Sequence, residues 1–98
     1  MFLARATPDV LDLLSQVADE LVSLLGISKA EAVARINAQW SDQKFLEDSE
    51  IILHEDPYYW ALSIYYNGEV PDLSLEADRS SWTPSAPPEK GTIYWTIE

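Results

Sequence analysis

His54, Glu55 and Asp56 form the one place in the chain where a histidine stands among carboxylates. Such a trio could carry general acid–base chemistry or supply ligands to a metal ion. Neither site can be completed, because the chain has one histidine and no cysteine, and Tyr58 stands where an HExxH zinc site has its second histidine. Asp56 is better explained as a helix cap before Pro57. We therefore predict a capping or structural role, no metal or cofactor, and no enzymatic activity, with catalysis by His54 and Glu55 as the least favoured alternative.

Other catalytic or ligand-binding motifs are missing from the sequence. No serine stands in a GxSxG turn, and the three glycines are too scattered to cradle a phosphate. The acidic stretch 42–53 lacks the central glycine and the final glutamate of an EF-hand calcium loop. These absences favour a binding or structural protein over an enzyme.

The charge of the chain is strongly negative and unevenly placed. Seventeen Asp and Glu stand against six Lys and Arg, which gives a net charge of −11. Residues 42–56 hold six carboxylates and one lysine, and they run directly into the uncharged, aromatic residues 57–66. Because phosphate contacts need Lys and Arg, we expect no binding to nucleic acid or to an anionic membrane. The charge would instead attract a basic protein, or it serves solubility alone.

Length and composition predict one globular domain over residues 1–98. Hydrophobic residues make up 47% of the chain and charged residues 23%, which is typical of folded proteins. Acidic residues interrupt the apolar stretch near the N-terminus, so we predict neither a signal peptide nor a membrane span. The lack of cysteine fits a reducing compartment, and we expect a cytoplasmic protein.

The first helix has clear boundaries in the sequence. Thr7 is a suitable N-cap, Pro8 suits the first helical position, and Gly26 is a typical stop, which together predict a helix over 8–25. Its apolar stripe covers well over half of the circumference. Such a helix is expected to be buried on two sides, or on one side and by a partner.

A second helix is predicted to follow at once. Ser28 and Glu31 have the spacing of a capping box, and the apolar pattern continues to Trp40. The short connection predicts an antiparallel helical hairpin. Residues 41–53 are expected to add one or two short helical turns, with Phe45 and Leu46 facing inward.

A shorter, aromatic helix is predicted after the acidic block. Asp56 and Pro57 begin it, and Asn67-Gly68 ends it. Both of its faces are apolar or aromatic. The helix is therefore expected to be buried, or half buried and half an interface.

After this helix four prolines prevent long helices. Two β-prone segments, at about 72–76 and 92–97, could pair as a short hairpin. Alternatively, the tail lies across the helices or reaches a second subunit. The predicted fold is mainly α: a helical hairpin with a shorter third or fourth helix, forming a helical core over 8–67, and an extended tail over 69–98.

The tyrosines of the third helix and the carboxylates before it are the best candidates for a binding surface. Aromatic residues are enriched at protein interfaces, although an aromatic core is the simpler explanation for Trp60 and Tyr65. The predicted partner-binding residues are Asp48, Glu50, Glu55, Tyr58, Tyr59 and Tyr66.

Residues 54–66, HEDPYYWALSIYY, resemble a segment of small bacterial proteins with an HExPxYWA-like stretch, a resemblance that implies no activity. The chain is also similar to the colicin-type nuclease immunity proteins, which are short, acidic and helical and carry a His-and-acid turn followed by paired tyrosines. The matching residues here are His54, Glu55 and Asp56, followed by Tyr58-Tyr59 or Tyr65-Tyr66. The spacing differs and the β-prone tail departs from the four-helix pattern, so this likeness implies a binding role and no fold.

We therefore expect a non-enzymatic protein that binds a basic protein partner, with an immunity-like or antitoxin-like role as its concrete form. The alternative is a homo-oligomeric structural protein, in which the wide apolar faces and the β-prone tail are buried between subunits.

Overall fold

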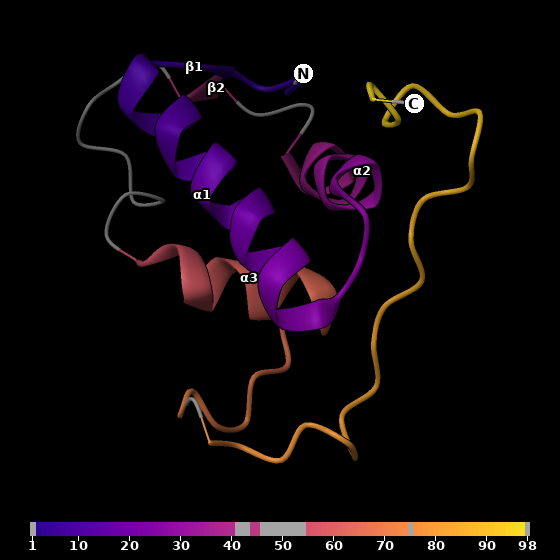
Figure 1. Cartoon of the computed structure of the whole chain (residues 1–98). Helices are drawn as coiled ribbons and strands as arrows, with labels where there is room; N and C mark the ends of the chain where they lie inside the picture. The colour runs from indigo at the N-terminus through magenta and orange to yellow at the C-terminus, as the bar shows by residue number, and fades with distance from the viewer. Residues whose placement is uncertain (1, 41–43, 46–54, 75, 98) are drawn as a thin grey trace.

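Three helices and a long tail make up the fold. The computed structural model describes residues 2–40, 44–45, 55–74 and 76–97. Its elements in chain order are β1 (Arg5–Ala6), α1 (Pro8–Leu25), α2 (Lys29–Trp40), β2 (Lys44–Phe45) and α3 (Pro57–Tyr65). α1 packs against both α2 and α3, and the tail passes over the outside of the helices (Figure 1). The prediction of a mainly α fold is confirmed. No helix in the described ranges is long and apolar enough to cross a membrane.

α1 begins and ends where the sequence predicts. The Thr7 side chain accepts a hydrogen bond from the Val10 amide, and Pro8 occupies the first turn. Gly26 adopts a left-handed conformation with a φ of 68°, and its amide donates to the Val22 carbonyl at 3.1 Å. A left-handed residue after the last turn redirects the chain and satisfies a free carbonyl, which is why glycine ends this helix. The inner face is fully apolar and consists of Val10, Leu13, Leu14, Val17, Ala18 and Leu21.

α2 is surrounded on nearly all sides. The Ser28 hydroxyl accepts from the Glu31 amide at 3.1 Å, which confirms half of the predicted capping box. The Glu31 carboxylate instead accepts from Arg35 Nε, at 2.9 Å. All six residues from 32 to 37 are buried, because α1 and α3 cover one side of the helix and the tail covers the other.

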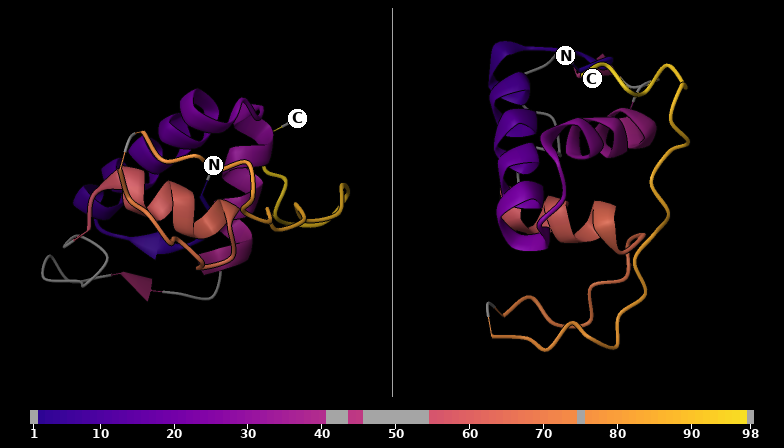
Figure 2. Two further views of the ribbon diagram at one scale, coloured as in Figure 1. Left: turned by 90° about the horizontal axis from the view of Figure 1, so that it is seen from below. Right: turned by 45° about the vertical axis from the view of Figure 1, so that its right-hand side comes forward.

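The antiparallel helical hairpin is not confirmed. α2 is seen nearly end on in Figure 1, whereas α1 runs across the view, and the right-hand view of Figure 2 shows α2 lying crosswise to α1. The short connection keeps the helix ends close but does not set the crossing angle. Gly26 turns the chain sharply at that point.

α3 is also confirmed at both ends. The Asp56 carboxylate accepts from the Tyr59 amide at 3.1 Å, and Pro57 follows it as the first helical residue. Asn67 and Gly68 both have positive φ values, of 56° and 83°, so the helix cannot continue through them. The buried face consists of Ala61, Leu62 and Ile64.

A short strand pair replaces part of the predicted fourth helix. Lys44 and Phe45 form β2, which pairs in parallel with β1, so that Arg5 faces Lys44 and Ala6 faces Phe45. The helical prediction is therefore wrong at these two residues, where backbone groups of the N-terminal segment find partners in an extended chain. The remainder of 41–53 lies outside the described residues.

The predicted β-hairpin of the tail is wrong. The described residues of 72–76 and 92–97 contain no strand. The tail instead runs beneath α3 and returns past the outside of α2, crosswise to that helix, towards the N-terminus (Figure 2), which confirms the alternative that it lies across the helices. The last segment finds its partners on the helices instead: Ile97 packs against the core and the Tyr94 carbonyl accepts from Asn37 of α2, whereas Ile93 stays 75% exposed.

Asn37 holds both ends of the chain against α2. Only 1% of this residue is exposed. Its Oδ1 accepts from the Leu3 amide at 2.9 Å, and its Nδ2 donates to the Tyr94 carbonyl at 2.8 Å. The Asn37 carboxamide thus gives each of the two extended segments a backbone hydrogen bond of the kind that a neighbouring strand would have supplied.

We predict that Asn37→Ala lowers the free energy of unfolding by about 2 kcal/mol, because it removes a buried donor and a buried acceptor together. Urea denaturation measures the loss, and amide hydrogen exchange of Leu3 should accelerate more than that of α1. Gln39→Ala, on the exposed side of the same helix, is the control and should cost less than about 0.5 kcal/mol. Unchanged protection of the Leu3 amide in the Asn37 variant would contradict the assignment.

Candidate protein-binding surface

The structure places the predicted partner-binding residues in three different situations. Asp48 and Glu50 lie outside the described residues. Glu55 is exposed, at the start of α3. Tyr58 and Tyr59 are half-buried on the first turn of the same helix, whereas Tyr66 is buried at its end. The start of α3 is therefore the described part of the predicted surface.

Tyr66 does not belong to this surface. It is only 6% exposed, and its ring contacts Tyr65 and Trp82 edge to face, at centroid distances of 4.9 and 5.1 Å. Trp82 comes from the tail, which covers this end of α3. Helical spacing alone puts Tyr66 on an outer face. Its burial could not be predicted locally, because the tryptophan that covers it lies sixteen residues later in the sequence.

Tyr59 is the outer member of a row of aromatic rings. Its ring meets Trp60 edge to face at 5.1 Å, and Trp60 meets the core residue Trp40 in the same way at 5.4 Å. Neighbouring Tyr58 is fixed differently, because its hydroxyl donates to the Ser74 carbonyl of the tail at 3.1 Å. Both tyrosines therefore present half-exposed rings whose positions are already set by the fold.

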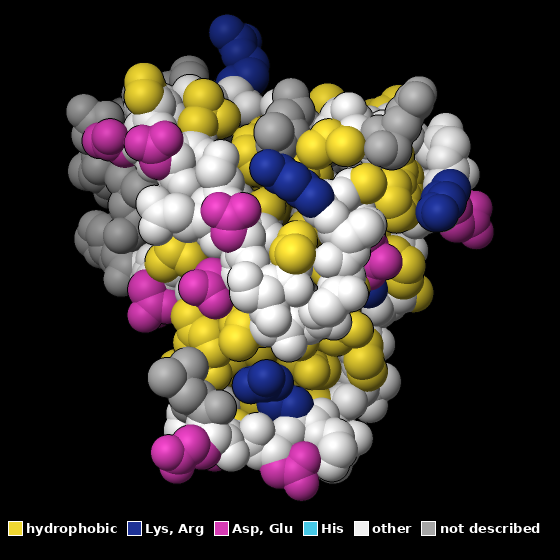
Figure 3. Space-filling view, in the orientation of Figure 1, with side chains coloured by type: hydrophobic (Ala, Val, Ile, Leu, Met, Phe, Trp, Pro, Cys, Tyr) yellow, Lys and Arg dark blue, Asp and Glu magenta, His cyan; other side chains and the backbone are white. Residues whose placement is uncertain are grey.

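Carboxylates near this surface have few internal partners. Among the described side chains one ion pair is formed, between Arg35 and Glu31 at 2.9 Å. Acidic side chains gather over α1 on the left-hand part of the face in Figure 3, with no Lys or Arg among them. Of the described carboxylates, those other than Glu31 therefore form no ion pair with a described side chain. In the tail, the hydroxyl and amide of Ser80 lower the pKa of Asp78 by hydrogen bonding to its carboxylate.

Arg35 is a buried cation that the sequence analysis missed. Its Nη1 donates to the Ser85 hydroxyl at 3.0 Å, and its guanidinium lies 4.6 Å from the centre of the Tyr65 ring. The i, i+4 spacing of Glu31 and Arg35 was the available signal. Glu31 neutralises the Arg35 guanidinium, and the Ser85 hydroxyl accepts one of its hydrogen bonds. Arg35 therefore fastens the tail to α2 and α3.

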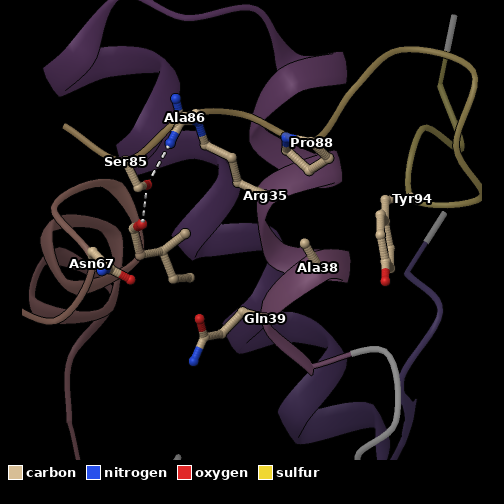
Figure 4. Close-up of a pocket in the computed structure, with 9 residues that line it drawn as sticks. Arg35, Ala38, Gln39, Asn67, Ser85, Ala86, Pro88 and Tyr94 are labelled. Atoms are coloured by element: carbon tan, nitrogen blue, oxygen red, sulfur yellow. Dashed lines mark hydrogen bonds between the residues drawn. The ribbon is translucent and has the colours of Figure 1, made fainter.

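A pocket of about 290 Å³ lies beside Arg35, between α2, the end of α3 and the tail. In Figure 4 Arg35 extends towards Ser85, while Gln39, Asn67 and Tyr94 stand around the pocket. The polar lining groups are these two amides, the Tyr94 phenol, the Arg35 guanidinium and the Ser85 hydroxyl, and the Ser85 hydroxyl donates to the Tyr65 carbonyl. Within the described ranges, no three His, Cys, Asp or Glu side chains are grouped to hold a metal ion. His54 lies outside those ranges.

Comparison with known proteins adds no further assignment: no protein-family model, curated protein or solved structure matches the chain.

Asp56 and Glu55 provide a test that separates the fold of this surface from its charge. We expect Asp56→Ala to lower the free energy of unfolding by about 1 kcal/mol, because the first turn of α3 loses its cap. Glu55→Ala removes the same charge from the adjacent exposed position and should cost less than about 0.5 kcal/mol. Urea denaturation measures both variants. Equal losses would show that the Asp56 hydrogen bond does not stabilise α3.

Proposed function

We propose that the chain is a non-enzymatic protein-binding domain whose acidic and aromatic surface at the start of α3 binds a basic protein partner. The observation that carries the proposal is the uncompensated negative charge. One of the described carboxylates has a cationic partner, and the net charge is −11. A basic partner would relieve the repulsion between the carboxylates and would associate quickly at low salt.

The row of aromatic rings that ends in Tyr59 would supply the apolar area of the proposed contact. Tyr59 is half-buried and rests on Trp60, so little conformational freedom remains to be lost on binding. Tyrosine and tryptophan are frequent hot-spot residues because one ring buries a large apolar area beside a polar group. Exposed Glu55, four residues earlier, would add a charge contact at the rim.

An immunity-like or antitoxin-like protein is the concrete form of this proposal, in which the partner would be a basic toxin or nuclease. The similarity of residues 54–66 to the immunity proteins supports that form, together with the small size and the acidity. A homo-oligomeric structural role is less well supported, because two copies would bring like charges together.

We predict that the purified chain, used as bait in a lysate of the cells that make it, captures a basic protein at low salt and releases it as salt is raised. Screening of the charge contacts should remove most of the captured protein between about 0.05 and 0.5 M salt. The Glu55→Gln/Tyr59→Ala double variant should capture several-fold less. Quantitative mass spectrometry of the eluates measures both effects.

The matched control is Glu89→Gln/Ile93→Ala, which removes one charge and one exposed apolar group from a part of the tail that does not contact the start of α3. It should capture as much as the unchanged protein. Each variant is first compared with the unchanged protein by thermal melting, so that a loss of folding is not read as a loss of binding. Equal capture by all three proteins, or capture that does not depend on salt, would overturn the proposal.

A further inference from the structure

The tail segment 83–89 is extended and rich in proline. It contains neither helix, strand, turn nor bend, and it includes Pro84, Pro87 and Pro88. Each proline fixes its own φ at about −65° and favours extended backbone at the residue before it. Between residues 83 and 88 these two restrictions act on every position except Ser85. They favour the backbone of a polyproline II helix.

Burial along this part of the tail repeats every three residues. Trp82, Ser85 and Pro88 are half-buried, whereas the four residues between them are exposed. A polyproline II helix has three residues per turn, so positions three apart lie on the same edge. The repeat therefore fits such a helix with one edge against the fold. A second edge, formed by Pro84 and Pro87, is exposed.

Each residue of the inner edge is held by a specific contact. The Trp82 ring packs edge to face on the end of α3. The Ser85 amide donates to the Tyr65 carbonyl at 2.7 Å, and the Pro88 carbonyl accepts from Trp95 Nε1 at 3.0 Å. Ser85 and Pro88 also line the pocket shown in Figure 4. The fold thus fixes the segment at three successive turns.

The exposed edge has the chemistry of a ligand for proline-recognition domains. Pro84 and Pro87 present two rings three residues apart, which is about 9 Å along a polyproline II helix. Ridges of this spacing dock in grooves that are lined by aromatic side chains. Proline has no amide hydrogen, so covering these two residues leaves no backbone donor without a partner. Because the inner edge already holds the segment, little chain entropy would be lost on binding.

We propose that Pro84 and Pro87 form a docking ridge for a partner domain whose aromatic-lined groove reads polyproline II helices. The ridge is a second interaction surface, separate from the start of α3, and it does not rest on the proposed function. Stiffening of the tail is the other role that two exposed prolines would have, and that role predicts no binding.

The probe for this inference is a panel of purified SH3, WW and EVH1 domains, which are domains that read such ridges. We expect the fluorescently labelled full chain to bind at least one of them, as measured by anisotropy. Pro84→Ala and Pro87→Ala should each weaken that binding at least five-fold, because each removes one ring from the ridge. Raising salt from about 0.05 to 0.5 M should change the affinity less than two-fold, because the contact is apolar.

The matched control is Pro71→Ala, which removes an exposed proline from another part of the tail and should leave binding within two-fold of the original. Thermal melting of each variant shows first that it is folded. Binding to no domain of the panel would overturn the ridge, and so would equal weakening by all three substitutions. A peptide of residues 82–90 that binds a domain which the full chain does not bind would show that the fold covers the ridge, and would also overturn it.

Two further comparisons separate this inference from the proposed function. Glu55→Gln/Tyr59→Ala should leave binding to the panel unchanged, and weakening by that variant would move the contact to the start of α3 and overturn the ridge. Pro84→Ala and Pro87→Ala should leave the salt-dependent capture of the basic protein unchanged. Loss of panel binding with capture intact would therefore overturn the ridge alone, and the reverse result would overturn the proposed function alone.

Discussion

The Asn37 carboxamide joins the Leu3 amide on one side to the Tyr94 carbonyl on the other, so the two ends of the chain are placed by a single buried side chain of α2. Most of the tail has no secondary structure and cannot hold itself in place by a ladder of hydrogen bonds. Buried backbone groups need partners, and here a side chain provides them. The course of residues 84–97 along the outside of α2 depends on this interaction more than on the β-propensity of the tail.

Arg35, two residues earlier in α2, also fastens the tail. Its guanidinium links Glu31 of α2, Ser85 of the tail and the ring of Tyr65 at the end of α3. The Ser85 hydroxyl in turn donates to the carbonyl of Tyr65, at 3.0 Å. A buried charge is costly unless it is paired and hydrogen-bonded, and here it has both kinds of partner. The two polar residues of α2 thus explain why six successive residues of this helix are buried although its own sequence is only moderately apolar.

The parts that sequence reasoning could predict are those that local rules decide. Thr7, Gly26, Ser28 and Asp56 act through neighbours within four residues, so helix ends can be predicted from the chain itself. The crossing of α1 and α2, the β2 pairing and the course of the tail depend on contacts between distant residues. The hairpin of α1 and α2 is not confirmed, the helix at 44–45 is wrong, and for the tail the sequence left open the alternatives between which the structure decides. The same division holds for the candidate site. Glu55 and Tyr59 lie near the start of α3 as expected, whereas Trp82 covers Tyr66 from sixteen residues away.

The buried cation and the exposed carboxylates of the molecule have different roles. Arg35, the cation that is buried, already has its carboxylate partner within α2, so no structural ion pair has to break when an external cation approaches. The carboxylates of α1 lie on the solvent side of a helix whose inner face is wholly apolar, and they take no part in packing. The proposed basic partner would dock at the start of α3 with the helices keeping their present positions. The exposed carboxylates proposed for binding are therefore different side chains from those that pack the core.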